Sequence, residues 1–198
     1  AHNINLVTPT HFTEAILQSL EQPLPVPVVY NTNGYESVEN LKRLEGRIQI
    51  YLPDVKYSDD ALALRYSHAK EYFQTAKRAV REMFRQTGSY RISEETGLLE
   101  RGVVIRHLLL PNHVENTLRV IDWVAETFDP GEVLFSLMRQ YVPHGRAAEY
   151  PELNRRVTDE EYQRVEQHLY DSGIEDGFVQ DGESASDSFI PAFDGTGV

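Results

Sequence analysis

The alternation of short apolar runs with longer amphipathic stretches is the feature that most restricts how this chain can fold. Apolar runs of strand length occupy residues 4–8, 26–30, 48–55, 103–110 and 133–138. Helical spacing of apolar residues predicts helices over residues 11–22, 36–44, 59–86, 112–127 and 158–170. This order is typical of βα units around a parallel sheet. We therefore predict an α/β fold with about five βα units, either a doubly wound sheet or a barrel that lacks a unit.

Local signals refine this outline. The stretch 59–86 is long enough for a short helix followed by a long one. Asn112 with Glu115, and Thr158 with Glu161, have spacings that predict helix N-termini stabilised by capping pairs. After Gly177 only a short apolar run and an acidic, serine- and glycine-rich tail from about residue 181 remain. We expect residues 1–198 to form a single domain, because the chain has no internal repeat and can bury one core.

Charge and composition exclude several classes of function. The formal net charge is −12, so the average field repels phosphate backbones and nucleic acid is not an expected partner. No stretch approaches the ~18 consecutive apolar residues of a membrane span, and no signal peptide is visible. We expect a cytoplasmic protein without membrane contact.

The chain contains no cysteine. Disulfides, thiolate nucleophiles and cysteine-ligated metal sites are therefore excluded for it. No histidine pair has the spacing of a protease zinc motif, and no dinucleotide, P-loop or serine-hydrolase motif is present. The chain also begins at Ala1 without a methionine and enters its first strand at once, which predicts that it is truncated at the N-terminus relative to a larger reading frame.

Polar residues follow the predicted strands at the end where α/β proteins bind ligands. They are Thr8, Thr10 and His11, residues 31–34, Asp54, Lys56, Arg106, Gln140 and Tyr141. Asp54 and Lys56 are two residues apart on a strand and point to the same face, where they either meet a ligand, pair with each other or cap the next helix. Arg106 lies in the most apolar strand and needs an anion or several acceptors, so a site role is favoured over a pairing with Asp54.

Several stretches resemble radical S-adenosylmethionine proteins related to the pyruvate formate-lyase activating enzyme. They are HNINLVTPTH at 2–11, VYNTNGY at 29–35, IYLPDVKY at 50–57, VIRHL at 104–108, SLMRQY at 136–141, NRR at 154–156 and GFVQ at 177–180. The resemblance implies a partial TIM-like barrel, part of a (β/α)6 core. In that family a cysteine triplet after the first strand holds a 4Fe-4S cluster, and this chain resembles the part that follows the triplet.

The resemblance also implies a cofactor site. Asn31, Thr32 and Asn33 match the loop near the methionyl end of S-adenosylmethionine, and Asp54 and Lys56 match a pair placed against its carboxylate. Further matching positions are Arg106, near the ribose and carboxylate, Gln140 or Tyr141, near the adenosine, and Thr8 to Thr10, where the wider superfamily often has Gly-Gly-Glu. Asn31 stands where the activating enzymes commonly have aspartate, which removes one negative charge.

The implied activity is that of an activating enzyme. Such enzymes cleave S-adenosylmethionine reductively and use the 5′-deoxyadenosyl radical to abstract hydrogen from a glycine of a partner enzyme. The expected partners are a glycyl-radical enzyme or another protein substrate, and an electron donor for the cluster.

Without cluster ligands the chain alone is expected to be inactive. Its exposed sheet edge is expected to favour self-association.

Two alternatives remain at this point. The first is a non-catalytic barrel that binds a nucleotide-like ligand or a protein partner. The second is a general α/β enzyme that uses Asp54, Lys56 and Arg106 for acid–base chemistry, which would need a pocket and a perturbed lysine.

Overall fold

A computed structural model of the chain describes residues 1–179. The predicted acidic tail and Gln180 lie outside this part. The elements are β1 (Ile4–Val7), the 3-10 helix η1 (Pro9–Phe12), α1 (Thr13–Ser19), β2 (Val28–Thr32), α2 (Val38–Arg43), β3 (Ile50–Pro53), α3 (Asp60–Ser67), α4 (Tyr72–Thr87), β4 (Arg91–Ile92), β5 (Leu99–Leu108), α5 (Val114–Thr127), β6 (Leu134–Met138), the 3-10 helix η2 (Gly145–Glu149), α6 (Asp159–Asp171) and β7 (Gly177–Val179).

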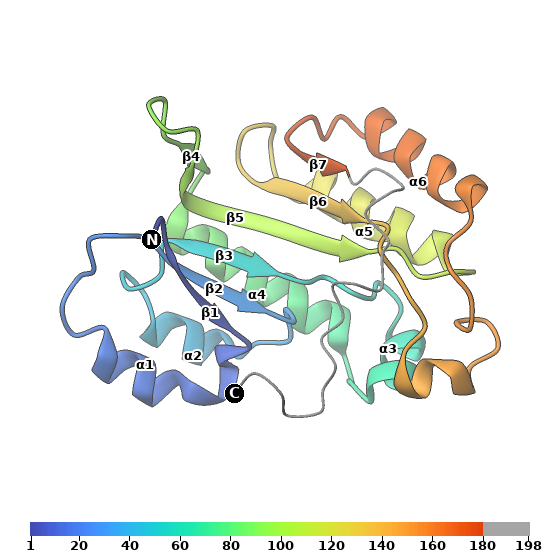
Figure 1. The fold of residues 1–198 in the computed structure, drawn as a ribbon, viewed down its shortest axis with the longest axis horizontal. Helices are drawn as coiled ribbons and strands as arrows, with labels where there is room; N and C mark the ends of the chain where they lie inside the picture. Colours follow the sequence, from blue (N-terminus) through green and yellow to red (C-terminus); the bar gives the residue numbers. More distant parts are fainter. Residues whose placement is uncertain (180–198) are drawn as a thin grey trace.

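The strands form one open sheet in the order β1-β2-β3-β5-β6-β7 (Figure 1). All neighbours on this path run parallel, and the short β4 pairs with β5 antiparallel. The predicted α/β class with its five parallel strands is confirmed. Two strands were missed: β7, which is the sixth parallel strand, and β4.

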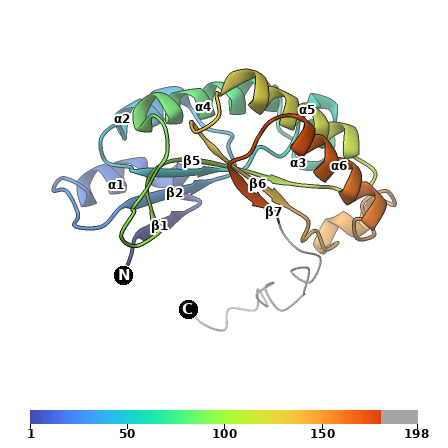
Figure 2. The ribbon, with the colours of Figure 1, turned by 90° about the horizontal axis from the view of Figure 1, so that it is seen from above.

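The helices lie mainly on one side of this curved sheet. Figure 2 shows α2, α4, α5 and α6 together over the same face, an arrangement that resembles an opened barrel wall more than a doubly wound sheet. Between the layers lies a core of buried side chains that includes Tyr30, Tyr51, Met83, Ile105, Ile121, Phe135 and Leu137.

The predicted helix boundaries differ in how well they hold. The stretch 59–86 does divide into a short helix, α3, and a long one, α4. Thr158 and Glu161 form the predicted capping box at the start of α6. The predicted Asn112–Glu115 pair is wrong, because α5 begins after His113 without a side-chain cap. The Asn112 amide group instead contacts the Glu152 carbonyl and Arg155.

His107 lies in the middle of this architecture and is fully buried on β5. Its Nδ1 lies 2.5 Å from the Val55 carbonyl oxygen, and its Nε2 lies 2.8 Å from Thr117 Oγ1 on α5. Burial lowers the pKa of His107 to about 4. The histidine is thus a neutral, hydrogen-bonded core residue. None of the helices within residues 1–179 is long and apolar enough to cross a membrane.

Candidate cofactor site at the carboxyl ends of the strands

The site is built where β2, β3 and β5 end beside one another. The Asp54 amide donates to the Thr32 carbonyl at 2.9 Å, and the Val55 amide donates to the Arg106 carbonyl at 2.9 Å. These bonds continue the sheet past the last residue of β3 and pair Asp54 with Arg106 across the strands. Side chains alternate along a strand, so Asp54 shares its face with Leu52, the register partner of Asn31. Asn31, Asp54 and Arg106 therefore project from the same face.

Four of the predicted residues meet in one cluster, which we call the charged cluster: Asn31, Asp54, Lys56 and Arg106. Arg106 Nη2 lies 2.7 Å from Asp54 Oδ1 and donates to Asn31 Oδ1 at 2.6 Å. Lys56 Nζ lies 3.6 Å from Asp54 Oδ2. The two pairings considered from the sequence, Asp54 with Lys56 and Asp54 with Arg106, are therefore both present. They form part of the candidate site.

The charged cluster has unfilled capacity for an anion. Two cations face one carboxylate, which leaves one positive charge in excess. The Nε of Arg106 is buried and has no hydrogen-bond partner within the described chain. Asp54 Oδ1 likewise accepts no hydrogen bond, so its 2.7 Å approach to Arg106 is a charge contact without hydrogen-bond alignment. A buried donor without a partner is costly, and a carboxylate ligand would satisfy it.

A pocket of about 200 Å³ opens beside this cluster. It is lined by Asp54, Lys56, Tyr57, Leu108, Leu110 and Met138. The lining combines two charged residues at one end with apolar side chains from the ends of β5 and β6. Such a surface suits a ligand that carries both an ionic group and an apolar part.

Tyr72 and Gly34 hold the strand ends in this arrangement. The Tyr72 hydroxyl lies 2.8 Å from the Asp54 carbonyl and 3.0 Å from the Asn33 carbonyl, and it accepts from the Lys56 amide at 2.9 Å. Gly34 has φ +77°, and a Cβ there would stand 2.3 Å from the Asp54 carbonyl oxygen. The turn after β2 can therefore approach β3 only with glycine at this position.

Thr32 and Thr10 belong to a second cluster on the helix side of the sheet. Thr10 Oγ1 donates to Glu36 Oε1 at 2.6 Å, and Thr32 Oγ1 donates to the same oxygen. Glu36 is buried, and its Oε2 has no hydrogen-bond partner in residues 1–179. Burial and the nearby Glu36 raise the pKa of Tyr30 above its usual value. Sequence reasoning missed Glu36, although a glutamate directly after the Asn-Thr-Asn-Gly-Tyr turn was a usable signal.

The other predicted residues occupy distinct positions. The Thr8 amide donates to the Asn31 carbonyl at 2.9 Å, with Thr8 in a left-handed conformation at φ 54°. Asn33 Oδ1 accepts from the Tyr35 amide, and Gln140 is exposed after β6. Tyr141 is buried and donates its hydroxyl to the Leu153 carbonyl at 3.0 Å. The structure thus brings four predicted residues together and leaves Thr8, Thr10, Thr32, Asn33, Gln140 and Tyr141 outside the charged cluster.

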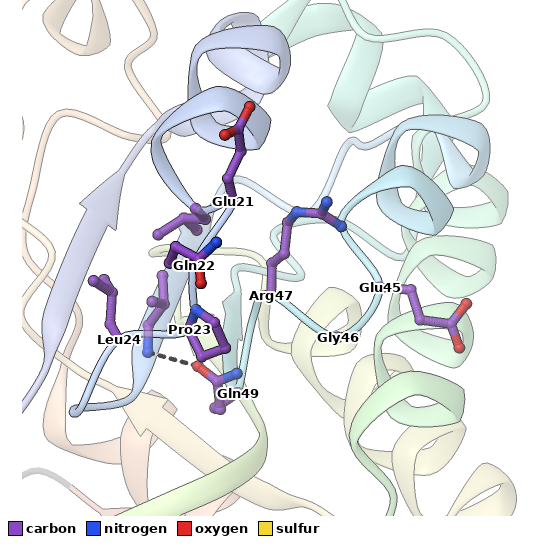
Figure 3. Close-up of a pocket in the computed structure, with 10 residues that line it drawn as sticks. Glu21, Gln22, Pro23, Leu24, Glu45, Gly46, Arg47 and Gln49 are labelled. Atoms are coloured by element: carbon purple, nitrogen blue, oxygen red, sulfur yellow. Dashed lines mark hydrogen bonds between the residues drawn. The ribbon is translucent and has the colours of Figure 1, made fainter.

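A separate pocket of about 250 Å³ lies at the opposite edge of the sheet (Figure 3). Glu21, Gln22, Glu45, Arg47 and Gln49 are among its lining residues. Gln49 Oε1 accepts from the Val28 amide at 2.9 Å, which fixes the start of β2. Ligands of parallel α/β sheets bind at the carboxyl ends of the strands, so we place the candidate site at the charged cluster and not here.

Metal ligation finds no support in this part of the molecule. Within residues 1–179 no group of three or more histidine, cysteine, aspartate or glutamate residues could hold a metal ion. The whole sequence also lacks cysteine. The chain's own residues therefore do not fit an iron–sulfur cluster held by thiolates.

Comparison with known proteins places this site in context. No protein-family model matches the chain. An uncharacterised protein of Methanocaldococcus jannaschii, MJ0674, is 34% identical over 167 residues, which cover 82% of this chain and 44% of that protein. The chain thus spans less than half the length of this relative.

Among solved structures, a domain of pyruvate-formate lyase-activating enzyme from Bacteroides vulgatus has a similar fold. The TM-score is 0.56 at 14% sequence identity, and the match covers 87% of this chain and 91% of the other. At this identity the likeness shows the fold alone, and it agrees with the α/β class predicted from the sequence.

Proposed function

We propose that this chain forms the S-adenosylmethionine-binding part of a radical enzyme of the pyruvate formate-lyase activating type. The observation that carries the proposal is the charged cluster, which lies at the carboxyl edge of a sheet that is similar in fold to a domain of such an enzyme. S-adenosylmethionine is an amino acid with a carboxylate joined to an adenosine. It therefore combines the ionic and apolar parts that the pocket beside the charged cluster suits.

The residues present fit the cofactor as follows. Lys56 and Arg106 would hold the carboxylate, because Arg106 has a buried Nε without a partner and Lys56 is about half-exposed at the pocket. Asp54 keeps both cations oriented. Asn31, with the turn through Asn33, would lie along the methionyl end, and Leu108, Leu110 and Met138 would contact the apolar part. When bound to a reduced cluster, this cofactor supplies a 5′-deoxyadenosyl radical for hydrogen abstraction.

The cluster itself requires ligands that this chain lacks, so we derive no step through it. We propose that cysteines elsewhere in a longer protein supply them, a view supported by the greater length of the M. jannaschii relative. The proposed partners are an electron donor and a glycyl-radical enzyme or another protein substrate. The chain by itself is expected to be inactive.

Titration calorimetry of the chain with S-adenosylmethionine tests the binding step. Replacing Arg106 by lysine keeps the charge but removes the planar fork of donors, so we expect affinity to fall about tenfold, or about 1.4 kcal/mol. Arg81→Lys on the exposed face of α4 is the matched control and should bind as the parent does. Equal affinity of the Arg106 variant and the parent would count against the assignment.

The radical step is tested on the full reading frame. Anaerobic cluster reconstitution followed by assay for 5′-deoxyadenosine should give product that depends on cysteines outside this chain. If such cysteines are absent, or an intact cluster gives no cleavage, the activating function is wrong.

The absence of cluster ligands favours one second candidate, a non-catalytic module that binds a nucleotide-like ligand or a protein partner. Binding of adenosine and S-adenosylmethionine with equal affinity, together with no cleavage by the full protein, would support this second function.

A further inference from the structure

A row of tyrosines runs along the carboxyl edge of the sheet. The ring centroids are 5.8 Å apart for Tyr35 and Tyr72, 5.4 Å for Tyr72 and Tyr57, 6.5 Å for Tyr57 and Tyr66, and 5.0 Å for Tyr66 and Tyr150. These separations are those of aromatic rings in direct contact. The tyrosine row, Tyr35-Tyr72-Tyr57-Tyr66-Tyr150, is therefore continuous.

The middle of the tyrosine row adjoins the candidate site. Tyr57 lines the pocket together with Asp54 and Lys56, and it is buried. Tyr72 is also buried and bonds to the backbone of Asp54 and Lys56. Any reactive species held in the pocket would thus be next to a phenol of this row.

Tyr66 differs from the others in what its hydroxyl contacts. It donates to Glu152 Oε1 at 2.8 Å and lies 2.9 Å from His113 Nε2. A backbone hydrogen bond and the one from Tyr66 lower the pKa of Glu152, so this carboxylate is ionised at neutral pH. Burial lowers the pKa of His113, so its imidazole is neutral at pH 7. Because the single phenolic proton is donated to Glu152, His113 Nε2 donates to the phenol oxygen, and Glu152 is the proton acceptor of Tyr66.

Within residues 1–179 the other hydroxyls of the row form hydrogen bonds with no ionisable acceptor. Tyr35 and Tyr150 donate to backbone carbonyls, Tyr72 does so as well, and Tyr57 contacts the Ser67 hydroxyl. Removing an electron from a phenol makes its O–H group strongly acidic, so oxidation is most favourable where a base can accept the proton at once. Tyr66 is therefore the tyrosine of the row whose oxidation is most favourable.

We propose that Tyr66 is a redox-active tyrosine and that the row carries a one-electron oxidising equivalent from the pocket to it. A carbon-centred radical in the pocket gains one electron through Tyr57 and one proton from the ammonium group of Lys56, which lines the same pocket, so that the radical carbon becomes a C–H group. Another one-electron oxidant, such as a photo-oxidised metal complex, gains the electron alone. Tyr66 loses one electron and passes its phenolic proton to Glu152, which leaves a neutral tyrosyl radical. That a radical forms in the pocket rests on the proposed function. Electron transfer along the tyrosine row would quench a radical that fails to react with its substrate, and would place the oxidising equivalent on Tyr66.

The absence of cysteine allows a direct test on the full chain without cofactor. A ruthenium photo-oxidant attached to Met138→Cys delivers oxidising equivalents at the pocket, and the same label on Glu21→Cys delivers them at the opposite edge of the sheet. Laser flash spectroscopy and freeze-quenched electron paramagnetic resonance then record the tyrosyl radical. We expect a persistent tyrosyl signal from the label at position 138, formed faster than from the label at position 21.

Variants assign that signal. Tyr66→Phe should abolish the persistent signal, Tyr57→Phe should slow its formation, and Glu152→Gln should shorten its lifetime because the base is lost. Tyr170→Phe, an exposed position outside the row, should change nothing. A persistent signal in Tyr66→Phe with an unchanged circular dichroism spectrum would overturn the proposal, as would an unchanged rate in Tyr57→Phe.

This experiment uses neither S-adenosylmethionine nor a cluster. Failure of the chain to bind S-adenosylmethionine would therefore remove the proposed function and leave the tyrosine result intact. Absence of the Tyr66 signal would remove this inference alone.

Discussion

Gly34 lets the turn after β2 touch the backbone of Asp54, and this contact fixes one side of the charged cluster. An alanine at position 34 would have to adopt φ +77° with its Cβ 2.3 Å from the Asp54 carbonyl oxygen. We expect Gly34→Ala to cost about 3 kcal/mol of folding free energy, from backbone strain and from displacement of β3. Urea unfolding measures this loss.

Gly46 provides the matched control, because it has φ +80° but no atom within 4 Å of an added Cβ. Gly46→Ala should cost about 1 kcal/mol, the price of the backbone conformation alone. If Gly34→Ala and Gly46→Ala lowered the free energy of unfolding equally, the close approach of Gly34 to Asp54 would contribute nothing to stability.

At the residue scale the sequence identified the charged cluster well. Asp54, Lys56 and Arg106 were predicted because charged residues in apolar strands must find partners, and Asn31 because of the resemblance. Glu36 was missed because the glutamate after the turn was not weighed as a signal, and its burial depends on contacts with Thr10 and Thr32 that the sequence does not show. Thr32 was predicted with Asn31, but neighbouring residues of a strand point to opposite faces, so only one of them lies in the charged cluster.

Among the elements, β3, β5 and α5 are joined by one buried side chain, His107, and this link predicts a pH dependence of stability. The pKa of His107 is lowered to about 4 in the fold, against 6.5 for the free side chain. Below pH 6.5 the unfolded chain binds a proton that the folded chain does not. Stability from this source is therefore complete above pH 6.5 and is lost as the pH falls to 4, by about 3 kcal/mol in all.

Unfolding by urea at several pH values measures this slope. Nuclear magnetic resonance of the His107 ring provides the control, because the ring should stay neutral down to about pH 5. Titration of His107 near pH 6.5 would show that the ring is not desolvated as the structure implies.

The helix starts show where local sequence suffices and where it does not. The α6 capping box forms because Thr158 and Glu161 bond to the backbone of their own turn, a contact that needs no other element. Asn112 lies in an equally suggestive pattern, yet its side chain bonds to the Glu152 carbonyl and to Arg155, which are distant in sequence. Tertiary partners therefore override the local cap.

Across the whole molecule the open sheet leaves β1 as an edge strand. This strand contains no charged residue, and Ile4 and Val7 are 40% and 65% exposed. Natural edge strands are commonly protected by charges or proline. We therefore expect the chain to self-associate through β1 at tens of micromolar, in keeping with the edge predicted from the sequence.

Sedimentation velocity over a range of concentrations tests this expectation. Val7→Lys places a charge on the exposed edge and should shift the chain toward monomer, whereas Val179→Lys on β7 at the other edge should not. A parent chain that is monomeric throughout this range would refute association through β1.

By itself the sequence determined the α/β class, the succession of five parallel strands along the chain, and the charged residues Asp54, Lys56 and Arg106 as groups that need partners. These follow from periodicity and from the cost of burying charge, which act along the chain. Only the tertiary structure decided that the sheet stays open, that β4 and β7 join it, and that Glu36 and the tyrosine row assemble. These features depend on contacts between residues far apart in sequence. The segments that contain them are short or polar, so they show no hydrophobic periodicity.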